Sequence, residues 1–440
     1  MAAWTRVNDR EPCGAQYNVA AGGRARSSHG ALTVGTSMTH RPNHRFAHRA
    51  ERFARAVMPD QSRDPTHPRG RFPGRVFYRR TIMATPSAHR QLYCRDAFEL
   101  FSEAFERMAH EFGEQLTEVD FVLAGRRVRA RILGAELGRM FQKAFEFHPG
   151  VGEPALEIWL WDESPDTGID SRIRLESGLD ERALRASVVT GISESGRYVC
   201  HTAETWLNFL DLEHARIVGC VLSRAGLHIH ERARPLEWPL RFWLRRVGLH
   251  VLHAGLVARD GAGVLIAGPA GAGKSTVALA CVDGGLDYLA DDKVGLETVG
   301  TGAYVGHRLY RSILASVDVL DRFPHLRSHA QRRDTDGEGK AILMVSELFP
   351  QRLAGSCRIE AIVLPRLDAG LLAPRLRLAR RTEAVTRMLP NCLPLYPTWN
   401  RDDFGRLGSL VQSVPVFWLD VAGPPASLPA LIERAARRSL

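Results

Sequence analysis

Apolar and polar positions follow two different periods along residues 89–234, which predicts a mixture of helices and strands. In 94–112, CRDAFELFSEAFERMAHEF, large apolar residues recur every three or four positions, as in an amphipathic helix. In 118–134, EVDFVLAGRRVRARILG, they alternate on both sides of Ala124-Gly125, as in a β-hairpin. A second helix is expected over 135–147, and strands or hairpins over 155–163, 197–211 and 216–230. Residues 89–234 therefore predict a small α+β module.

A stripe of apolar residues at helical spacing runs through 235–253, PLEWPLRFWLRRVGLHVLH. The residues that recur on roughly one face are Leu236, Leu240, Trp243, Leu244, Val247 and Val251. Such a stripe marks packing more often than a cofactor site. We therefore expect one helix here, which docks the α+β module onto the region that follows.

From His253 to the C-terminus, strands alternate with helices. The expected order is a strand (253–259), a tight turn (260–263), a strand (264–268), a glycine-rich loop, a helix that opens at Lys274 and a strand ending at 292. Further strands and helices are expected at 341–345, 358–367, 381–389, 401–412 and 415–421, before a final helix. This alternation predicts an α/β domain, which we expect to cover residues 235–440.

The net charge of +10 over 440 residues lies almost wholly in the N-terminal segment. Residues 1–90 contain 16 arginines, five acidic residues and no lysine, with frequent Gly, Pro, Ser and His. This composition predicts a disordered basic tail over residues 1–88. Its irregular basic spacing is more typical of a solvated segment than of a nucleic-acid interface. Met83, which precedes ATPSAHRQLY, raises the hypothesis that the natural protein starts there.

Cysteine usage and hydropathy favour a cytoplasmic protein. The seven cysteines, at positions 13, 94, 200, 220, 281, 357 and 392, include no CxxC pair and no metal-binding spacing with histidine. We therefore expect free thiols in a reducing compartment. The sequence has no run of about 18 apolar residues, and its N-terminus lacks an apolar signal core. No membrane partner is expected, while homo-oligomerisation stays open.

Residues 268–275 match the phosphate-loop pattern GxxxxGK[ST], between an apolar strand and a helix. Glycines let backbone N–H groups curl around phosphate oxygens, and the helix N-terminus adds its positive dipole end. Lys274 can reach the β- and γ-phosphates of ATP, and the Ser275 hydroxyl can ligate Mg²⁺. The expected ATP-binding residues are Gly268, Pro269, Ala270, Gly271, Ala272, Gly273, Lys274, Ser275 and Thr276.

A rare lysine and a pair of carboxylates strengthen this interpretation. The chain has only four lysines, at 143, 274, 293 and 340, so composition poorly explains a lysine at this point of the motif. Asp291 and Asp292 end the strand after the loop's helix, and a strand beside the loop's own strand would place them next to the phosphates. Neighbouring residues on a strand point to opposite faces. One aspartate is therefore expected to help hold Mg²⁺, and the other to accept a proton from an attacking hydroxyl.

Residues 253–297, HAGLVARDGAGVLIAGPAGAGKSTVALACVDGGLDYLADDKVGLE, resemble the catalytic core of the bacterial HPr kinase/phosphorylase family. His253, Lys274 and the aspartate pair share the spacing of that family without a gap. The resemblance implies a P-loop kinase domain whose fold is similar to that of phosphoenolpyruvate carboxykinase.

The resemblance also implies a role for each matching residue. Lys274 would bind phosphates, and Ser275 would ligate Mg²⁺. Asp292 would accept the proton during serine phosphorylation, with Asp291 beside it as metal or structural support. His253 would lie next to the reacting phosphate.

Departures from the family pattern leave the acceptor open. Thr276 stands where the family has a glutamate, and the glycine-rich signature with a further metal-ligating glutamate does not follow the core. Residues 89–234 do not resemble the regulatory domain of that family. The chain is therefore more similar to the broad group of HPr-kinase-related proteins, some of which are thought to work near peptide-modifying enzymes.

These features predict an ATP- and Mg²⁺-dependent kinase that transfers the γ-phosphoryl group to a hydroxyl, with a serine of a protein or peptide as the expected acceptor. One alternative is an ATP-binding regulator or assembly factor of a peptide-modification system that transfers no phosphate. Another is a kinase of a small molecule. Lys340, at a loop–strand junction, is equally compatible with a substrate contact and a solvated charge.

Overall fold

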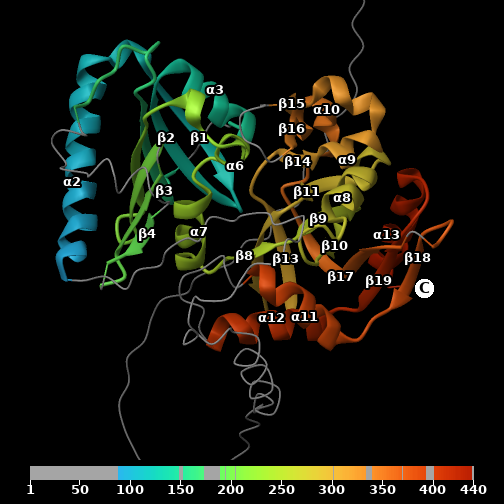
Figure 1. Cartoon of the computed structure of the whole chain (residues 1–440). Helices are drawn as coiled ribbons and strands as arrows, with labels where there is room; N and C mark the ends of the chain where they lie inside the picture. The colour runs from blue at the N-terminus through green and yellow to red at the C-terminus, as the bar shows by residue number, and fades with distance from the viewer. Residues whose placement is uncertain are drawn as a thin grey trace, which may run out of the picture. The chain divides into compact units, whose positions relative to one another are not determined.

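The described part of the chain forms two large β-sheets and a small one, with helices packed against them (Figure 1). This computed structural model describes residues 88–147, 152–172, 189–193, 195–203, 205–300, 302–332, 339–368, 370–392 and 401–438. All of them belong to one unit of the chain, Asp60–Leu440. Residues 1–87, which hold the predicted tail and the hypothetical start at Met83, lie outside the described residues.

The first sheet has seven strands. Their order is β1 (Leu116–Leu123), β2 (Arg126–Leu133), β3 (Leu156–Asp162), β7 (Arg216–Val221), β6 (Trp206–Asp211), β5 (Tyr198–Thr202) and β4 (Val189–Ile192). β1 and β2 form the expected hairpin, in which Ala124 and Gly125 have φ angles of 50° and 76°. A two-residue turn that matches the twist of its strands needs positive φ at both positions. β2, β3 and β7 run parallel, and the other neighbours are antiparallel.

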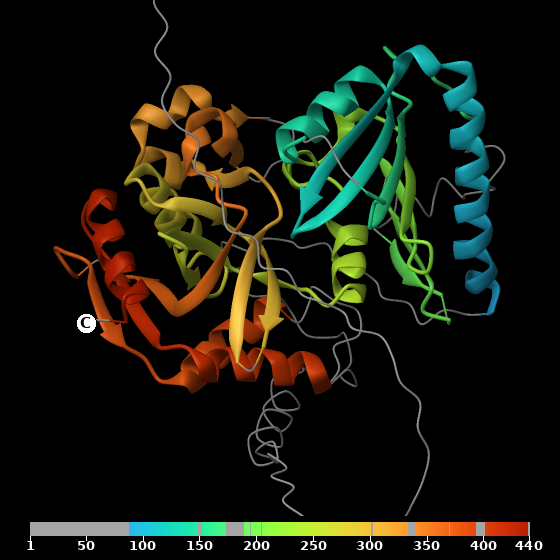
Figure 2. The same ribbon diagram turned by 180° about the vertical axis from the view of Figure 1, so that it is seen from behind.

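Helices cover both faces of the first sheet (Figure 2). On one face, α2 (Ala88–Glu111) packs Phe101 and Phe105 against Trp161. On the other face, α3 (Ala135–Ala144) and α7 (Glu237–Arg246) bury their apolar side chains in a single cluster with the sheet. The indole of Trp243 also donates to the backbone oxygen of Ala155, 3.3 Å away. α7 therefore packs on the first sheet and leads directly into the second.

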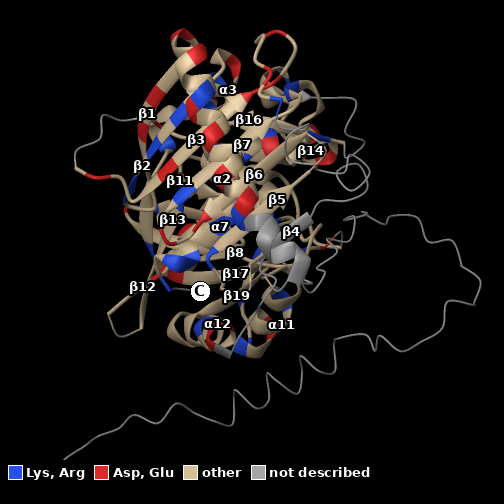
Figure 3. Cartoon of the chain, turned by 90° about the vertical axis from the view of Figure 1, so that its left-hand side faces the viewer, with Lys and Arg blue, Asp and Glu red and all other residues tan. Residues whose placement is uncertain are grey.

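Charged positions of both signs are mixed on the strands at the β1 edge (Figure 3). Arg127 of β2 makes two hydrogen bonds to Asp120 of β1. Arg131 reaches Glu118 of β1 and Glu106 of α2, both at 3.0 Å. Because each of these arginines faces a carboxylate, this face of the sheet is a mixed surface and not a uniformly basic one.

Acid is expected to destabilise the first sheet through His201. This residue of β5 is 6% exposed, and its ring stacks on Trp238 with 5.6 Å between the centroids. Burial, reinforced by the charge of Arg241, lowers the pKa of His201 to about 3. The folded protein therefore holds this imidazole neutral, whereas the unfolded chain takes up a proton near a pH of about 6.5. Stability contributed by the neutral form is lost as the pH falls from about 6.5 towards 3.

Urea unfolding at a series of pH values measures this loss. We expect the free energy of unfolding of His201→Gln to fall less steeply with acid than that of the wild type, by up to about 1.4 kcal/mol per pH unit in this window. The exposed His110 on α2 supplies a matched control, and His110→Gln should follow the wild type. Equal acid slopes for His201→Gln and the wild type would contradict the assignment.

The second sheet has nine strands. Its main order is β11 (Asp287–Ala290), β9 (Gly255–Arg259), β10 (Ala262–Ile266), β17 (Ser356–Leu367), β13 (Ala303–Arg308), β12 (Lys293–Val299) and β8 (His250–His253). β19 (Val416–Val421) pairs in parallel with the C-terminal part of β17, and β18 (Arg375–Leu378) pairs with β19. β10, β17 and β19 all run in one direction, so their carboxyl ends meet at one edge of the sheet.

Helices also cover both faces of the second sheet (Figure 1). α8 (Lys274–Asp283) and α13 (Leu428–Ala436) pack on one face, and α11 (Arg381–Cys392) and α12 (Arg401–Ser413) on the other. The small sheet has the order β14 (Ser312–Ser316), β16 (Lys340–Met344) and β15 (Gln331–Arg332), with the short helices α6 (Ile229–Ala233), α9 (Val317–Asp321) and α10 (Val345–Leu348) against it. The mixed α/β fold class predicted from the sequence is confirmed.

The helix predicted over 235–253 is too long. α7 ends at Arg246, Gly248 takes a φ of 90°, and β8 begins at His250. Val251 lies on this strand and is buried in the same apolar cluster as the side chains of α7. Its spacing in the sequence therefore looked like one more turn of the helix. As a second consequence, His253 ends β8 and does not begin the following strand.

Two further predictions concern membrane-spanning helices and the cysteine thiols. Within the described residues, no helix is both long and apolar enough to cross a membrane. Five described cysteines are buried and form no disulfide: Cys200, Cys220, Cys281, Cys357 and Cys392. Burial raises the pKa of the Cys281 thiol above its ordinary value and that of Cys392 to about 11, so both are held as neutral apolar groups.

Candidate active site

The glycine-rich loop connects the end of β10 to the start of α8. Gly268, Gly271 and Gly273 all have positive φ angles, of 157°, 78° and 97°. Residues with a Cβ rarely adopt a positive φ angle, so the loop needs glycine at these three positions to turn the chain into the helix. Gly273 is the N-cap residue of α8, and Lys274 is its first residue. The N–H groups of the first helical turn therefore lie beside the loop, where they can receive an anion.

Lys274 folds back over this loop. Its side chain is buried, and Nζ donates to the backbone oxygens of Gly268 at 2.9 Å and Pro269 at 3.1 Å. The side-chain amide of Asn391, on α11, donates to the same Gly268 oxygen. Burial lowers the pKa of Lys274, and Asp292 and Asp291 are the carboxylates that act against this shift. The ammonium of Lys274 thus lies within electrostatic reach of both aspartates.

The aspartate pair follows β11, but β11 is not the neighbour of the loop's strand. β11 pairs with β9, and β9 pairs with β10, in both cases antiparallel. β9, which precedes β10 in the chain, thus occupies the place beside β10 that the sequence analysis gave to the strand of the aspartates. Two antiparallel steps restore the direction, so β10 and β11 end at the same edge. Asp291 and Asp292 therefore stand at the edge that carries the glycine-rich loop.

Asp291 is buried towards the small sheet. Its Oδ2 accepts the backbone N–H of Leu314, on β14, at 3.1 Å, and its Oδ1 lies 3.9 Å from Nη2 of Arg234. Only 3% of the residue is exposed. Burial raises the pKa of Asp291 to about 6, against the opposing charge of Arg234. This carboxyl group is therefore the one of the pair that gains a proton more readily.

Asp292 points towards β8 and is surrounded by cations. Its Oδ1 lies 2.6 Å from Nε2 of His253, and its Oδ2 lies 2.7 Å from Nζ of Lys293 and also contacts Arg234. Burial alone would raise the pKa of Asp292, but Arg234, Lys293 and His253 hold it well below its ordinary value. Burial lowers the pKa of His253 despite this contact. The side chain of Asp292 is 15% exposed, so it is the more accessible carboxylate of the pair.

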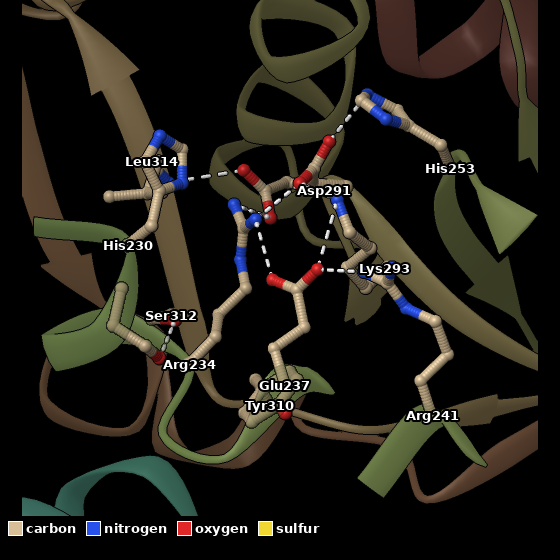
Figure 4. A network of polar contacts seen from close by, with 12 residues as sticks. His230, Arg234, Glu237, Arg241, His253, Asp291, Lys293, Tyr310, Ser312 and Leu314 are labelled. Carbon is tan, nitrogen blue, oxygen red and sulfur yellow. Dashed lines mark hydrogen bonds and ion pairs between the residues drawn. The ribbon is translucent and has the colours of Figure 1, made fainter. Parts of the chain in front are cut away.

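Four charged residues of this centre were not assigned a role from the sequence. Arg234, after α6, places its guanidinium between Asp291 and Glu237 (Figure 4). Glu237, in the first turn of α7, also contacts Arg241 and lies 3.5 Å from Lys293. Only Lys293 could have been singled out from the sequence, because lysine is rare in this chain and Lys293 is one of four. The arginines gave no such signal because arginine is abundant throughout the sequence.

The network is balanced in charge. It joins the carboxylates of Asp291, Asp292 and Glu237 to the cations of Arg234, Arg241 and Lys293. Burial would raise the pKa of Glu237, but Lys293, Arg241 and Arg234 lower it to about 2. Charges are tolerated at such depth only when they are paired and hydrogen-bonded. All three carboxyl groups therefore have a partner of opposite charge within the protein itself.

The donor groups suit Mg²⁺ in kind. Asp291, Asp292 and the hydroxyl of Ser275, a half-buried residue, offer hard oxygen ligands, which Mg²⁺ prefers. Within the described ranges, no three His, Cys, Asp or Glu side chains form a group that could hold a metal ion. Mg²⁺ is commonly bound by one or two carboxylates together with substrate phosphates and water. The residues therefore fit a metal that is shared with a phosphate ligand, and they do not form a complete protein cage.

The structure also places the other loop residues and Lys340, which the sequence analysis named as candidates. Pro269 and Ala270 form the outer part of the loop, and Thr276 is buried in the first turn of α8. Lys340 opens β16, and its Nζ lies 3.3 Å from Nε2 of His230 on α6. Lys340 therefore contacts the short helix that precedes Arg234 and is not a fully solvated loop charge.

Comparison with known proteins adds little to this geometry. No protein-family model matches the chain, and no curated protein matches it. Among 97 matching chains of solved structures is the Hpr(Ser) kinase/phosphatase from Coxiella burnetii. The two chains share 18% identity over 43% of this chain and 95% of that chain, with a TM-score of 0.24. A similarity this low establishes neither a fold family nor an activity for this protein.

Proposed function

We propose that this protein is an ATP- and Mg²⁺-dependent kinase that transfers the γ-phosphoryl group to a hydroxyl, with a serine of a protein or peptide as the acceptor. One observation carries the proposal. The loop with Lys274 and the pair Asp291 and Asp292 lie at the same edge of the second sheet. Phosphoryl transfer needs these groups together, because it depends on positioning and on charge stabilisation.

The roles follow from the placement of each group. The backbone N–H groups of the loop and of the first turn of α8 hold the phosphates, and Lys274 exchanges the oxygens of Gly268 and Pro269 for phosphate oxygens. The Ser275 hydroxyl and Asp291 hold Mg²⁺, which supplies positive charge against the phosphate oxygens when bound. The acceptor oxygen forms a bond to the γ-phosphorus while the bond to the β–γ bridging oxygen breaks, and ADP leaves. The hydroxyl proton passes to Asp292.

Asp292 suits the role of proton acceptor in position and in ionisation. Its low pKa keeps it ionised at neutral pH, and it is the more exposed carboxylate of the pair. His253 holds one of its oxygens at 2.6 Å and so fixes the direction of the carboxylate. A carboxylate with such a low pKa is a weak base, so its contribution depends on its position next to the attacking hydroxyl more than on its basicity.

A second candidate is an ATP-binding regulator that transfers no phosphate. It is favoured by one observation, the engagement of every oxygen of Asp291 and Asp292 by Leu314, Arg234, His253 or Lys293. In this case the pair would be structural, and the loop alone would bind the nucleotide. A kinase of a small molecule would use the same groups as the protein kinase and differ only in its acceptor.

Two measurements on the full chain test the proposal. Calorimetric titration with ATP, with and without Mg²⁺, should show binding that is stronger with the metal. Incubation with γ-labelled ATP should then label serine in a library of peptides, but not in the matched library with alanine at that position. Binding without transfer to any peptide or to small alcohols would favour the regulator, and no binding of ATP would reject both. Labelling of small alcohols alone would favour the small-molecule kinase.

A further inference from the structure

Arg234 is the residue whose charge lies between the carboxylates of the candidate site. Only 3% of it is exposed. One guanidinium nitrogen contacts Asp292 and lies 3.7 Å from Glu237, and another lies 3.9 Å from Asp291 (Figure 4). Arg234 thus meets all three acidic groups, while Lys293 contacts Asp292 and Glu237, and Arg241 contacts Glu237.

The backbone around Arg234 is fixed on both sides. The Ser312 hydroxyl donates to the oxygen of Ala233 at 2.7 Å, and the Tyr310 hydroxyl donates to the oxygen of Pro235 at 3.2 Å. Leu236, the N-cap residue of α7, has a positive φ of 57°, which a leucine adopts only when its surroundings hold it there. The guanidinium is thus delivered to the aspartate pair by an anchored segment and not by a loose side chain.

This placement has a consequence for metal binding. A divalent ion that entered alone would have to displace Arg234 or Lys293 from the carboxylates, or add two charges to a buried network that is already neutral. An ion that arrives bound to a triphosphate brings an excess of negative charge with it. That negative charge can offset Lys274, Arg234 and the ion together.

We propose that the guanidinium of Arg234 stays bound to the aspartate pair and so keeps free divalent metal out of the site. The site then admits the metal only together with a nucleoside triphosphate. The inference rests on the proposed function, since it assumes that the pair receives a metal–nucleotide complex. Arg234 is a positioning residue in this scheme, because it acts through Asp291 and Asp292 and not on the substrate.

Arg241 supplies a matched control within the same network. It is also 3% exposed and contacts Glu237, and its guanidinium lies over the ring of Trp238, 4.5 Å from the centroid. Its ion pair is with Glu237, whereas Arg234 also reaches Asp291 and Asp292. Arg241→Met therefore removes one buried positive charge from the network but leaves the cation on the aspartate pair.

The test is Mn²⁺ binding to the full chain, measured by the electron spin resonance of free Mn²⁺. Mn²⁺ shares the preference of Mg²⁺ for oxygen ligands. We expect weak binding to the wild type without nucleotide and strong binding with ATP. Without nucleotide, Arg234→Met should bind Mn²⁺ at least about tenfold more tightly than the wild type, because the competing cation is gone. Arg234→Lys and Arg241→Met should remain close to the wild type.

The outcomes separate this inference from the proposed function. Strong Mn²⁺ binding to the wild type without nucleotide, or equal affinities for the wild type and a folded Arg234→Met, would overturn the role of Arg234. Failure of the wild type to take up ATP under any condition would instead reject the proposed function. If Arg234→Met is too unstable to titrate, its melting temperature gives the answer, since Mn²⁺ should raise it more than that of the wild type. No such difference would also overturn the inference.

Discussion

Replacement of Lys274 by alanine is expected to lower phosphoryl transfer by roughly 1000-fold, to the background of the assay, and to weaken the binding of ATP. Lys274 lies directly on the glycine-rich loop, where its ammonium donates to the backbone oxygens of Gly268 and Pro269. Without it, the charge that develops on the transferred group faces only backbone amides and the metal. Initial rates with γ-labelled ATP and calorimetric titration measure the two effects.

Controls decide whether the loss comes from the site. Lys143 pairs with Glu347 and is half exposed, so Lys143→Ala should leave transfer and ATP binding unchanged. Lys274→Ala also removes two hydrogen bonds from the loop, and thermal unfolding shows whether the protein stays folded. A folded Lys274→Ala with rates within a few-fold of the wild type would exclude the loop as the phosphate site.

Local patterns in the sequence predicted the local elements of the fold. The apolar spacing of 94–112 became α2, and the alternation around Ala124-Gly125 became the hairpin of β1 and β2. The glycine-rich loop also lies where the motif placed it, between a strand and a helix. These features depend on residues a few positions apart, so the sequence contains them directly.

Strand order was harder to predict because it depends on pairing between distant segments. The antiparallel hairpin of β9 and β10 places β9 between the loop's strand and β11, and the aspartates reach the common edge only because two reversals cancel. The error over 247–253 has a similar cause. Val251 contacts the same apolar cluster from a strand as α7 does from a helix, so burial alone could not distinguish the two.

The candidate site was predicted only where a motif marks it. Lys274 and the aspartate pair carry a recognisable spacing, but Arg234 reaches Asp292 across 58 positions of sequence. An arginine in an arginine-rich chain gives no signal that it will be buried.

The second large effect is expected at Asp292. Asp292→Asn should bind ATP nearly as well as the wild type and transfer phosphate roughly 100- to 10,000-fold more slowly. Asparagine keeps the shape of the side chain and an oxygen that His253 can approach, but it cannot take the proton of the acceptor hydroxyl. Calorimetry and single-turnover transfer on the same preparation separate binding from chemistry.

Asp291→Asn is the matched variant, because it removes the neighbouring charge but leaves Asp292 in contact with His253 and Lys293. If Asp291 helps to hold the metal, this change should weaken the affinity for Mg²⁺, and additional Mg²⁺ should restore part of the rate. Retained turnover in Asp292→Asn would reject Asp292 as the proton acceptor. If Asp291→Asn alone abolishes transfer, with ATP binding intact and no recovery in Mg²⁺, the roles are exchanged. The carboxyl group whose pKa burial raises to about 6 would then be the base, and the low-pKa carboxylate of Asp292 would hold the cations around it.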